Sequence, residues 1–145
     1  MTIRRAQLSD FAAVSDLLEQ LGRGRVTHET YAACREIYAA QLEDPSTDHL
    51  VAVGDRGKVV GFCSLHYRTR LNRPRPQAWI PDLVVTSAAR GRGTARALLD
   101  RAEALARERG CWEVTLESRH ERRDAHLLYT AAGMQEVGKT FRKEL

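Results

Sequence analysis

The feature that most constrains this fold is an amphipathic helix that directly follows a short apolar strand and a glycine-containing turn. Between residues 94 and 109 apolar side chains recur three and four positions apart, which predicts a helix with one buried face, and Gly110 is placed to end it. Residues 79–85 read as a strand in which Pro81 removes a ladder donor, which predicts a bulge or an edge. The helix stripe consists of Ala95, Leu98, Leu99, Ala102, Leu105 and Ala106.

The rest of the chain supplies elements for one sheet with flanking helices. Its 145 residues suit a single domain spanning 1–145. The order of elements predicts an α/β fold with a mixed central β-sheet. Strands are predicted at 2–6, 49–53, 58–66, 111–118, 134–137 and 140–145. One helix is predicted after an N-cap at Ser9, a second at 28–42 and a third after a cap at Asp124. A hairpin turn is predicted at 54–57 and a polar loop at 68–77.

Composition excludes several classes of protein. The chain is 43% hydrophobic and 29% charged, which is ordinary for a globular protein and too apolar for disorder. No apolar run approaches the roughly 20 residues that cross a bilayer, and the N-terminus lacks the apolar core of a signal peptide, so a cytoplasmic protein is expected. The three cysteines, Cys34, Cys63 and Cys111, are far apart, so neither a disulfide framework nor a metal site is expected.

The turn before the long helix has the chemistry of an anion site. Gly91 and Gly93 let backbone approach a ligand closely, and the first amides of the helix carry a partial positive charge. Arg90 and Arg92 add charge-assisted donors. The spacing fits neither a P-loop, which needs GxxxxGK, nor a dinucleotide fingerprint, which needs GxGxxG. Taken by itself, the turn also fits an ordinary surface connection.

The motif Arg90-x-x-Gly93-x-Ala95 resembles the (Gln/Arg)-x-x-Gly-x-(Gly/Ala) signature of the GNAT superfamily of acetyl-CoA-dependent N-acetyltransferases. The apolar strand before it and the segment from Arg123 to Met134, with Tyr129-x-x-x-Gly133, are similar to that family's fourth strand and closing helix. The order of elements matches along the chain. Within the superfamily the sequence most resembles small-molecule acetyltransferases of the aminoalkylphosphonate type.

The resemblance implies a binding mode for the cosubstrate acetyl-CoA, with no metal. Backbone of Leu83 to Val85 would run along the pantetheine arm, and amides of the turn would hold the pyrophosphate. The acetyl carbonyl would accept a hydrogen bond from backbone near Val84 or Val85, which also stabilises the oxyanion. The implied cofactor-binding residues are Leu83, Val84, Val85, Arg90, Gly91, Arg92, Gly93, Thr94, Ala95 and Arg96.

The resemblance also implies direct attack of an amine on the thioester in a ternary complex. Tyr129 matches the family tyrosine that protonates the departing thiolate, although its spacing also fits a core aromatic. Glu117 and Asp82 are candidate bases, because the amine must lose a proton before it attacks. Three histidines, His66, His120 and His126, and a water-mediated route stay open. The family's common glutamate is Pro81 here, and its asparagine is missing from residues 120–123.

The predicted function is transfer of acetyl to a primary amine of a small molecule. An aminoalkylphosphonate is the favoured acceptor, because arginines crowd the predicted loop and suit bidentate phosphonate contacts. Alternatives are acetylation of a protein or peptide amine and a non-catalytic acyl-CoA-binding or regulatory module. A homodimer is expected, whereas nucleic-acid and membrane partners are not, since aromatics are only 6%. The loop arginines are Arg68, Arg70, Arg73 and Arg75.

Overall fold

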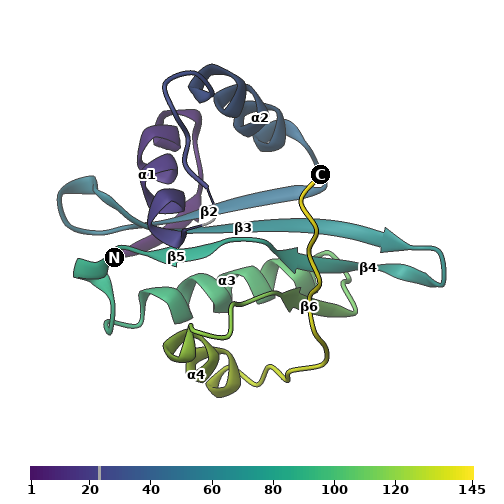
Figure 1. Ribbon diagram of the computed structural model, residues 1–145. Helices are drawn as coiled ribbons and strands as arrows, with labels where there is room; N and C mark the ends of the chain where they lie inside the picture. The colour runs from purple at the N-terminus through teal and green to yellow at the C-terminus, as the bar shows by residue number, and fades with distance from the viewer. Residues whose placement is uncertain (23) are drawn as a thin grey trace. The chain divides into compact units, whose positions relative to one another are not determined.

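The computed structural model describes residues 1–22 and 24–145, which form two compact units, 1–115 and 116–145. The first holds a sheet with three α-helices (Figure 1). Its elements are β1 (Thr2–Arg5), α1 (Phe11–Leu21), α2 (Tyr31–Glu43), β2 (Thr47–Val53), β3 (Val59–Arg70), β4 (Arg73–Ile80), β5 (Leu83–Val85) and α3 (Thr94–Glu108); β6 (Glu113–Leu116) runs into the second unit, which contains α4 (Arg123–Ala131).

The strands form a sheet in the order β1-β2-β3-β4-β6, and β5 pairs with β3 beyond the end of β4. Side chains alternate between the two faces of this sheet. In Figure 1, α1 and α2 cover one face and α3 covers the other. On the α3 face Gly61 of β3 lies against the helix, because a Cβ there would be 3.0 Å from Leu98 Cδ1. The predicted α/β fold is confirmed.

The helix stripe of α3 is buried as predicted. Leu98, Leu99 and Ala102 are fully buried. Gly110 closes the helix in a left-handed conformation, and the Cys111 amide donates to the Ala106 carbonyl at 2.9 Å, as in a Schellman cap. The strand of 79–85 is broken at 81–82 into β4 and β5, which confirms the irregularity that Pro81 predicts.

The predicted polar loop at 68–77 is wrong, because these residues complete β3 and β4 in a long hairpin. Pro76 removes no donor from the β3–β4 ladder. Its backbone faces away from β3, since its carbonyl accepts from the Trp112 amide at 3.0 Å. Pro74 lies where the register between β3 and β4 shifts. A proline whose missing N–H faces away from the partner strand is compatible with pairing.

The first helix begins differently from the prediction. Asp10, rather than Ser9, organises its start, by accepting from the Gln7 amide at 2.8 Å. Arg4 then pairs with Asp10 at 2.7 Å, and this guanidinium lowers the pKa of the Asp10 carboxyl. A buried carboxylate with these partners fixes β1 against the start of α1.

In the second unit, α4 ends at a Schellman cap. The Met134 amide donates to the Tyr129 carbonyl at 3.0 Å, and Gly133 has a φ of 85°. The predicted strands at 134–137 and 140–145 are wrong, since no helix or strand is found there. Val137 is 87% exposed and Phe141 is 91% exposed. A lone pair of short strands that buries neither apolar side chain is marginally stable at best in water.

Candidate active site

The glycine turn and the start of α3 form the first part of the site. Gly91 and Gly93 have φ angles of 71° and 78°, in the left-handed region that favours glycine. The first helical bond joins the Ala97 amide to the Gly93 carbonyl at 2.9 Å. The amides that precede Ala97 at a helix start have no partner within the helix, so they point at whatever lies before it. The turn therefore presents backbone donors and a partial positive charge to an anion.

The arginines of this turn differ in their contacts. Arg96 is exposed and pairs with Asp100 at 2.8 Å. Arg90 Nε donates to the Val85 carbonyl at 3.4 Å, which ties the turn to β5. Arg92 is exposed at the turn itself. Arg90 and Arg92 thus lie beside the amides of the helix start, whereas Arg96 pairs with a residue of the helix itself.

Strand β5 offers backbone groups on one side. It pairs antiparallel with β3, with Phe62 opposite Val84. The Ser64 amide donates to the Asp82 carbonyl at 2.9 Å, and the Thr86 amide donates to the Val60 carbonyl at 2.8 Å. Bonding in an antiparallel pair alternates, so the backbone of Val84 faces β3. The N–H and C=O groups of the neighbours on either side, Leu83 and Val85, face away from β3.

Asp82 occupies the break between β4 and β5. Its carboxylate accepts from Ser64 Oγ at 3.2 Å, and its amide donates to the same hydroxyl oxygen at 3.2 Å. Pro81 before it has no N–H to give to a ladder. The break therefore turns a carboxylate out of the sheet at the residue that immediately precedes β5.

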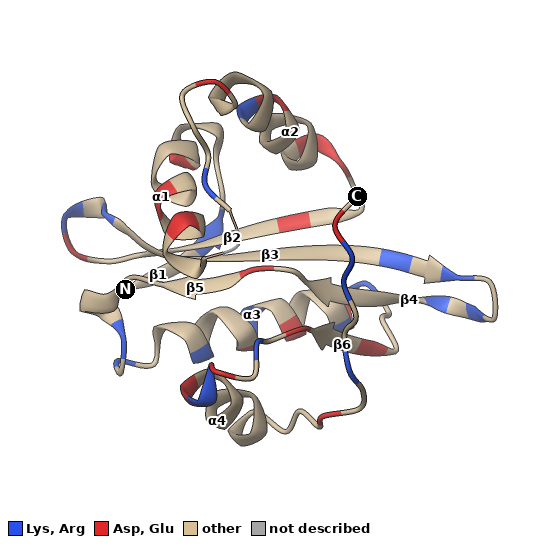
Figure 2. Ribbon diagram, in the orientation of Figure 1, with Lys and Arg blue, Asp and Glu red and all other residues tan. Residues whose placement is uncertain are grey.

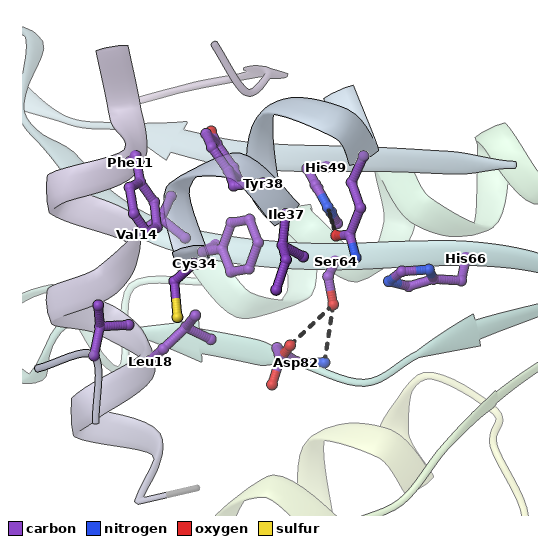
Figure 3. A pocket seen from close by; sticks show the side chains of 13 residues that line it. Phe11, Val14, Leu18, Cys34, Ile37, Tyr38, His49, Ser64, His66 and Asp82 are labelled. Carbon is purple, nitrogen blue, oxygen red and sulfur yellow. Dashed lines mark hydrogen bonds between the residues drawn. The ribbon is translucent and has the colours of Figure 1, made fainter. Parts of the chain in front are cut away.

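A pocket of about 240 Å³ ends at this carboxylate. It lies between the sheet and the helices α1 and α2, and Figure 3 shows Asp82 below Ser64, joined to it by dashed lines, with His66 to the right. All its lining residues belong to the first unit. They are Phe11, Val14, Leu18, Val26, Cys34, Ile37, Tyr38, Gln41, His49, Phe62, Ser64, His66 and Asp82.

His49 is a buried, polar member of the pocket wall. Its Nε2 lies 2.7 Å from Gln41 Oε1, and its ring stacks on Tyr38 with centroids 6.0 Å apart. Among the described residues its Nδ1 is buried with no hydrogen-bond partner. Burial, followed by the charge of His66, lowers the pKa of His49 to about 4. The ring is therefore neutral at pH 7.

His66 lies two residues after Ser64 on β3, on the same face. Its ring is half-buried, with centroids 5.7 Å from His49 and 5.6 Å from Trp79. Burial lowers the pKa of His66, and the nearby charge of Asp82 raises it by less. A neutral imidazole and a carboxylate therefore stand at one end of an apolar pocket, which suits the binding and deprotonation of an ammonium group.

The four arginines of 68–75 lie on the β3–β4 hairpin, whose far end is marked blue in Figure 2. Arg68 donates to Gln77 Oε1 at 2.7 Å, and its guanidinium lies 4.6 Å from the centre of the Trp79 ring. Arg73 stacks on Trp112 at 3.9 Å, and Arg75 donates to the Gly110 carbonyl at 2.9 Å. None of the four lines the pocket.

Comparison with known proteins gives this arrangement a family. The family model described as "Acetyltransferase (GNAT) family" matches residues 11–134. The chain belongs to the GNAT acetyltransferase family. It is similar to an aminoalkylphosphonate N-acetyltransferase of Salmonella typhimurium, with 33% identity over 99% of this chain and 90% of the relative.

One further relative and one solved structure are also similar to this chain. An aminoglycoside N(6')-acetyltransferase type 1 of Stenotrophomonas maltophilia is 29% identical over 94% of this chain and 87% of its own length. The glucosamine-6-phosphate N-acetyltransferase of Arabidopsis thaliana has the same fold, with a TM-score of 0.82 at 23% identity, covering 99% of this chain and 97% of that one. The family is one of acyltransferases.

The structure brings together some of the predicted site residues of the acetyltransferase. Asp82, β5 and the glycine turn lie in the first unit and follow one another along the chain. Tyr129 lies in α4, and Glu117 follows β6; both belong to the second unit, so their catalytic roles stay predictions. Ser64 and His49 were not predicted from the sequence, although the alternation of a strand puts Ser64 and His66 on one face.

None of the described helices of the acetyltransferase is long and apolar enough to span a membrane. Across residues 1–22 and 24–145, no three His, Cys, Asp or Glu side chains form a group that could hold a metal ion. Cys63 is fully buried, and burial raises the pKa of its thiol to about 12, so this thiol is not a nucleophile at neutral pH.

Proposed function

We propose that this protein transfers the acetyl group of acetyl-CoA to the primary amine of a small molecule bound in the pocket between α1, α2 and the sheet. One observation carries the proposal: Asp82, at the end of the pocket, is the residue directly before β5, whose outward backbone groups suit the cosubstrate. An amine held at Asp82 therefore lies next to the strand along which the family resemblance places the thioester.

The residues of the first unit suit acetyl-CoA. The backbone groups of Leu83 and the Val85 amide face away from β3 and suit pairing with the amides of the pantetheine arm in the manner of an added strand, while the Val85 carbonyl accepts from Arg90 Nε. The amides at the start of α3, with Arg90 and Arg92 beside them, suit the pyrophosphate. Acetyl-CoA supplies an activated acyl group, and the chain supplies position and proton transfer.

The proposed chemistry requires a neutral amine. The incoming ammonium binds at the Asp82 carboxylate and gives its proton to Asp82 or to the neutral His66 ring. The nitrogen lone pair then forms a bond to the acetyl carbon, and the carbon–sulfur bond breaks. Tyr129 gives a proton to the departing thiolate and regains one as the new amide nitrogen loses its second proton, so the products are an amide and a thiol. Glu117 is the alternative proton acceptor.

The cosubstrate site is tested at Gly93. A Cβ at this residue would meet no atom within 4 Å, but its φ is 78°, so any substitution carries backbone strain. Gly93→Asp and Gly93→Asn have nearly the same shape and strain and differ in charge. We expect calorimetry to show at least a 10-fold weaker affinity for coenzyme A in Gly93→Asp than in Gly93→Asn. Equal affinities would place the pyrophosphate elsewhere.

The role of Tyr129 is tested by Tyr129→Phe, which removes only the hydroxyl. If the hydroxyl protonates the thiolate, kcat should fall by about 10²-fold, a typical contribution of a positioned acid, while coenzyme A binding is kept. Release of free thiol from acetyl-CoA measures the rate. A variant that works at the parental rate would make Tyr129 a packing residue.

The finer predictions rest on the family likeness. An aminoalkylphosphonate acceptor is supported by the name of the Salmonella typhimurium relative and is tested by measuring thiol release with 2-aminoethylphosphonate. A cytoplasmic location, a homodimer and acetylation of a protein or peptide amine stay predictions. Acetylation of no small amine under conditions where acetyl-CoA binds would contradict the proposed function.

A further inference from the structure

We infer that the acceptor of this protein is a primary amine on an uncharged apolar body, such as an arylalkylamine or alkylamine. The inference rests on the proposed function and deepens it, because it names the class of molecule that fills the pocket. It departs from the anionic acceptor expected from the sequence. The observations behind it are the walls of the pocket, its charges and its size.

The walls that face the body of a ligand are apolar. Phe11, Val14 and Leu18 of α1 line one side, and Ile37 of α2 lines another (Figure 3). Phe62 of β3 also lines the pocket. Phe11 and Phe62 are buried, whereas Ile37 is 58% exposed at the rim. Tyr38 adds a ring whose hydroxyl is already engaged, since it donates to the Gln7 carbonyl at 2.7 Å. These walls reward burial of hydrocarbon and offer a charged tail no partner.

The charge of the pocket is concentrated in a single carboxylate. Asp82 is the only acidic side chain among the described lining residues, and none of them is Lys or Arg. His49 is neutral at pH 7, because burial lowers its pKa to about 4. Among the described lining residues, a phosphonate or carboxylate buried here would find no Lys or Arg to offset its loss of water. A polyamine would bury further ammonium groups with no second anion to receive them.

The cations that could have served an anionic acceptor lie elsewhere. The guanidinium of Arg68 is held over Trp79 and hydrogen-bonded to Gln77 Oε1. Arg75 donates to two backbone carbonyls, those of Gly110 at 2.9 Å and Cys111 at 3.0 Å. These contacts stabilise the β3–β4 hairpin and its approach to the end of α3. They give Arg68 and Arg75 a structural role.

The size of the pocket limits the acceptor to a small molecule. At about 240 Å³ it lies just below the range of roughly 300–1,000 Å³ that holds drug-sized ligands. One aromatic ring or a short alkyl chain fits within it, with the amine at Asp82 and the hydrocarbon between α1 and α2. A multi-ring polycation would exceed both its volume and its charge.

The test compares three amines at equal acetyl-CoA, by release of free thiol: 2-phenylethylamine, 2-aminoethylphosphonate and spermidine. We expect kcat/KM for 2-phenylethylamine to exceed both others by at least 10-fold. A preference for the phosphonate or for spermidine would overturn the inference and leave the proposed function standing, since acetyl transfer would still be observed.

A pair of variants shows whether the pocket sets this preference. Ile37→Arg places a cation at the exposed rim and should lower the ratio of 2-phenylethylamine to 2-aminoethylphosphonate kcat/KM by about 10-fold. Ala32→Arg adds the same charge to an exposed position of α2 that does not line the pocket, so the ratio should not change. An equal shift in both variants, or in neither, would show that the pocket does not hold the acceptor's body.

Binding separates failure of the inference from failure of the proposed function. The protein saturated with coenzyme A is titrated with 2-phenylethylamine or 2-aminoethylphosphonate in a calorimeter. Tighter binding of 2-phenylethylamine, lost in Ile37→Arg, supports the inference even if none of the amines is acetylated, in which case only the proposed function fails. Binding of the phosphonate that is equal or tighter overturns the inference whatever the rates.

Discussion

Adjacent residues on β2 and β3 build two polar clusters on opposite faces of one sheet. Asp48 and Tyr67 point to the face that α3 covers, whereas their neighbours His49 and His66 point to the face under α1 and α2. The two clusters share a backbone and differ in how well their polar groups are partnered. That difference separates a structural cluster from a candidate active site.

Every oxygen of the Asp48 carboxylate has a partner. Arg5 reaches Oδ1 at 2.9 Å, while Arg109 at 3.1 Å and the Tyr67 hydroxyl at 2.7 Å reach Oδ2. The Arg109 guanidinium also lies 4.4 Å from the centre of the Tyr67 ring and donates to the Pro45 carbonyl. Burial and the bond to Asp48 raise the pKa of Tyr67. Such a cluster fixes the end of α3 to the sheet and leaves nothing for a ligand.

The pocket cluster is the opposite case. Among the described residues, His49 has a buried nitrogen with no hydrogen-bond partner, and it shares the pocket with Ser64 and Asp82, which are hydrogen-bonded to each other. A polar group buried without a partner costs stability, and a fold keeps one where a ligand supplies the partner. We therefore expect substitutions in the pocket cluster to lower activity and substitutions in the Asp48 cluster to lower stability.

The largest effect is expected at Asp82. Asp82→Asn keeps the shape and can still accept from Ser64, but it removes the charge that would hold and deprotonate the amine. We expect kcat/KM to fall by about 10³-fold, within the usual range for a positioned base, with little change in the free energy of unfolding. Asp16→Asn, at an exposed position of α1, is the matched control. Retained activity in Asp82→Asn would leave Glu117 or His66 as the base.

Asp48→Asn should show the reverse signature. Removing this charge leaves two guanidinium groups facing an amide, and breaking a buried ion pair is strongly destabilising. Because Arg5 and Arg109 are partly exposed, we expect a loss of about 3 kcal/mol, at the lower end for such pairs, measured by urea unfolding. The control Glu103→Gln removes a surface pair with Arg107 and should cost under about 0.5 kcal/mol. Catalysis by the folded fraction should be unchanged.

The sequence predicted those parts of the fold that follow from local pattern. The α3 stripe, its closing glycine and the break at Pro81 are properties of short segments, and the structure confirms them. The hairpin of 68–77 was missed because the side on which a proline's missing N–H falls depends on register with other strands. Residues 134–137 and 140–145 were predicted to be strands from their apolar residues, but Val137 and Phe141 are exposed in the structure.

In the candidate site, too, the parts that follow from local pattern were predicted and the parts that depend on distant segments were not. The glycine turn and β5 were found because their spacing carries the family signature. The pocket could not be found, since its walls come from segments far apart in the chain, and α2 buries only Tyr38, so its sequence gives little sign of what it faces. His66 was recognised only as one histidine among several. Its place beside Asp82 depends on the pairing of β3 with β5.

The smallest expected effect is the pH dependence of stability that His49 causes. The pKa of His49 falls from 6.5 to about 4 on folding, so the unfolded chain binds more protons between these values. Stability is therefore fully present above pH 6.5 and falls as the pH drops toward 4. Between pH 7.0 and 4.5 we expect His49 to account for a loss of about 2 kcal/mol, since each unit is worth about 1.4 kcal/mol.

Urea unfolding of His49→Gln tests this, because the amide cannot take up a proton in that range. Its free energy of unfolding should depend less steeply on pH than that of the parent protein, whatever its value at pH 7. The pKa of His66 is lowered too, so a His49→Gln, His66→Gln double variant should be flatter still. His28→Gln, at an exposed site, is the control. Parallel curves for His49→Gln and the parent would mean that the His49 ring is not desolvated, and the contrast with the fully partnered Asp48 cluster would fail.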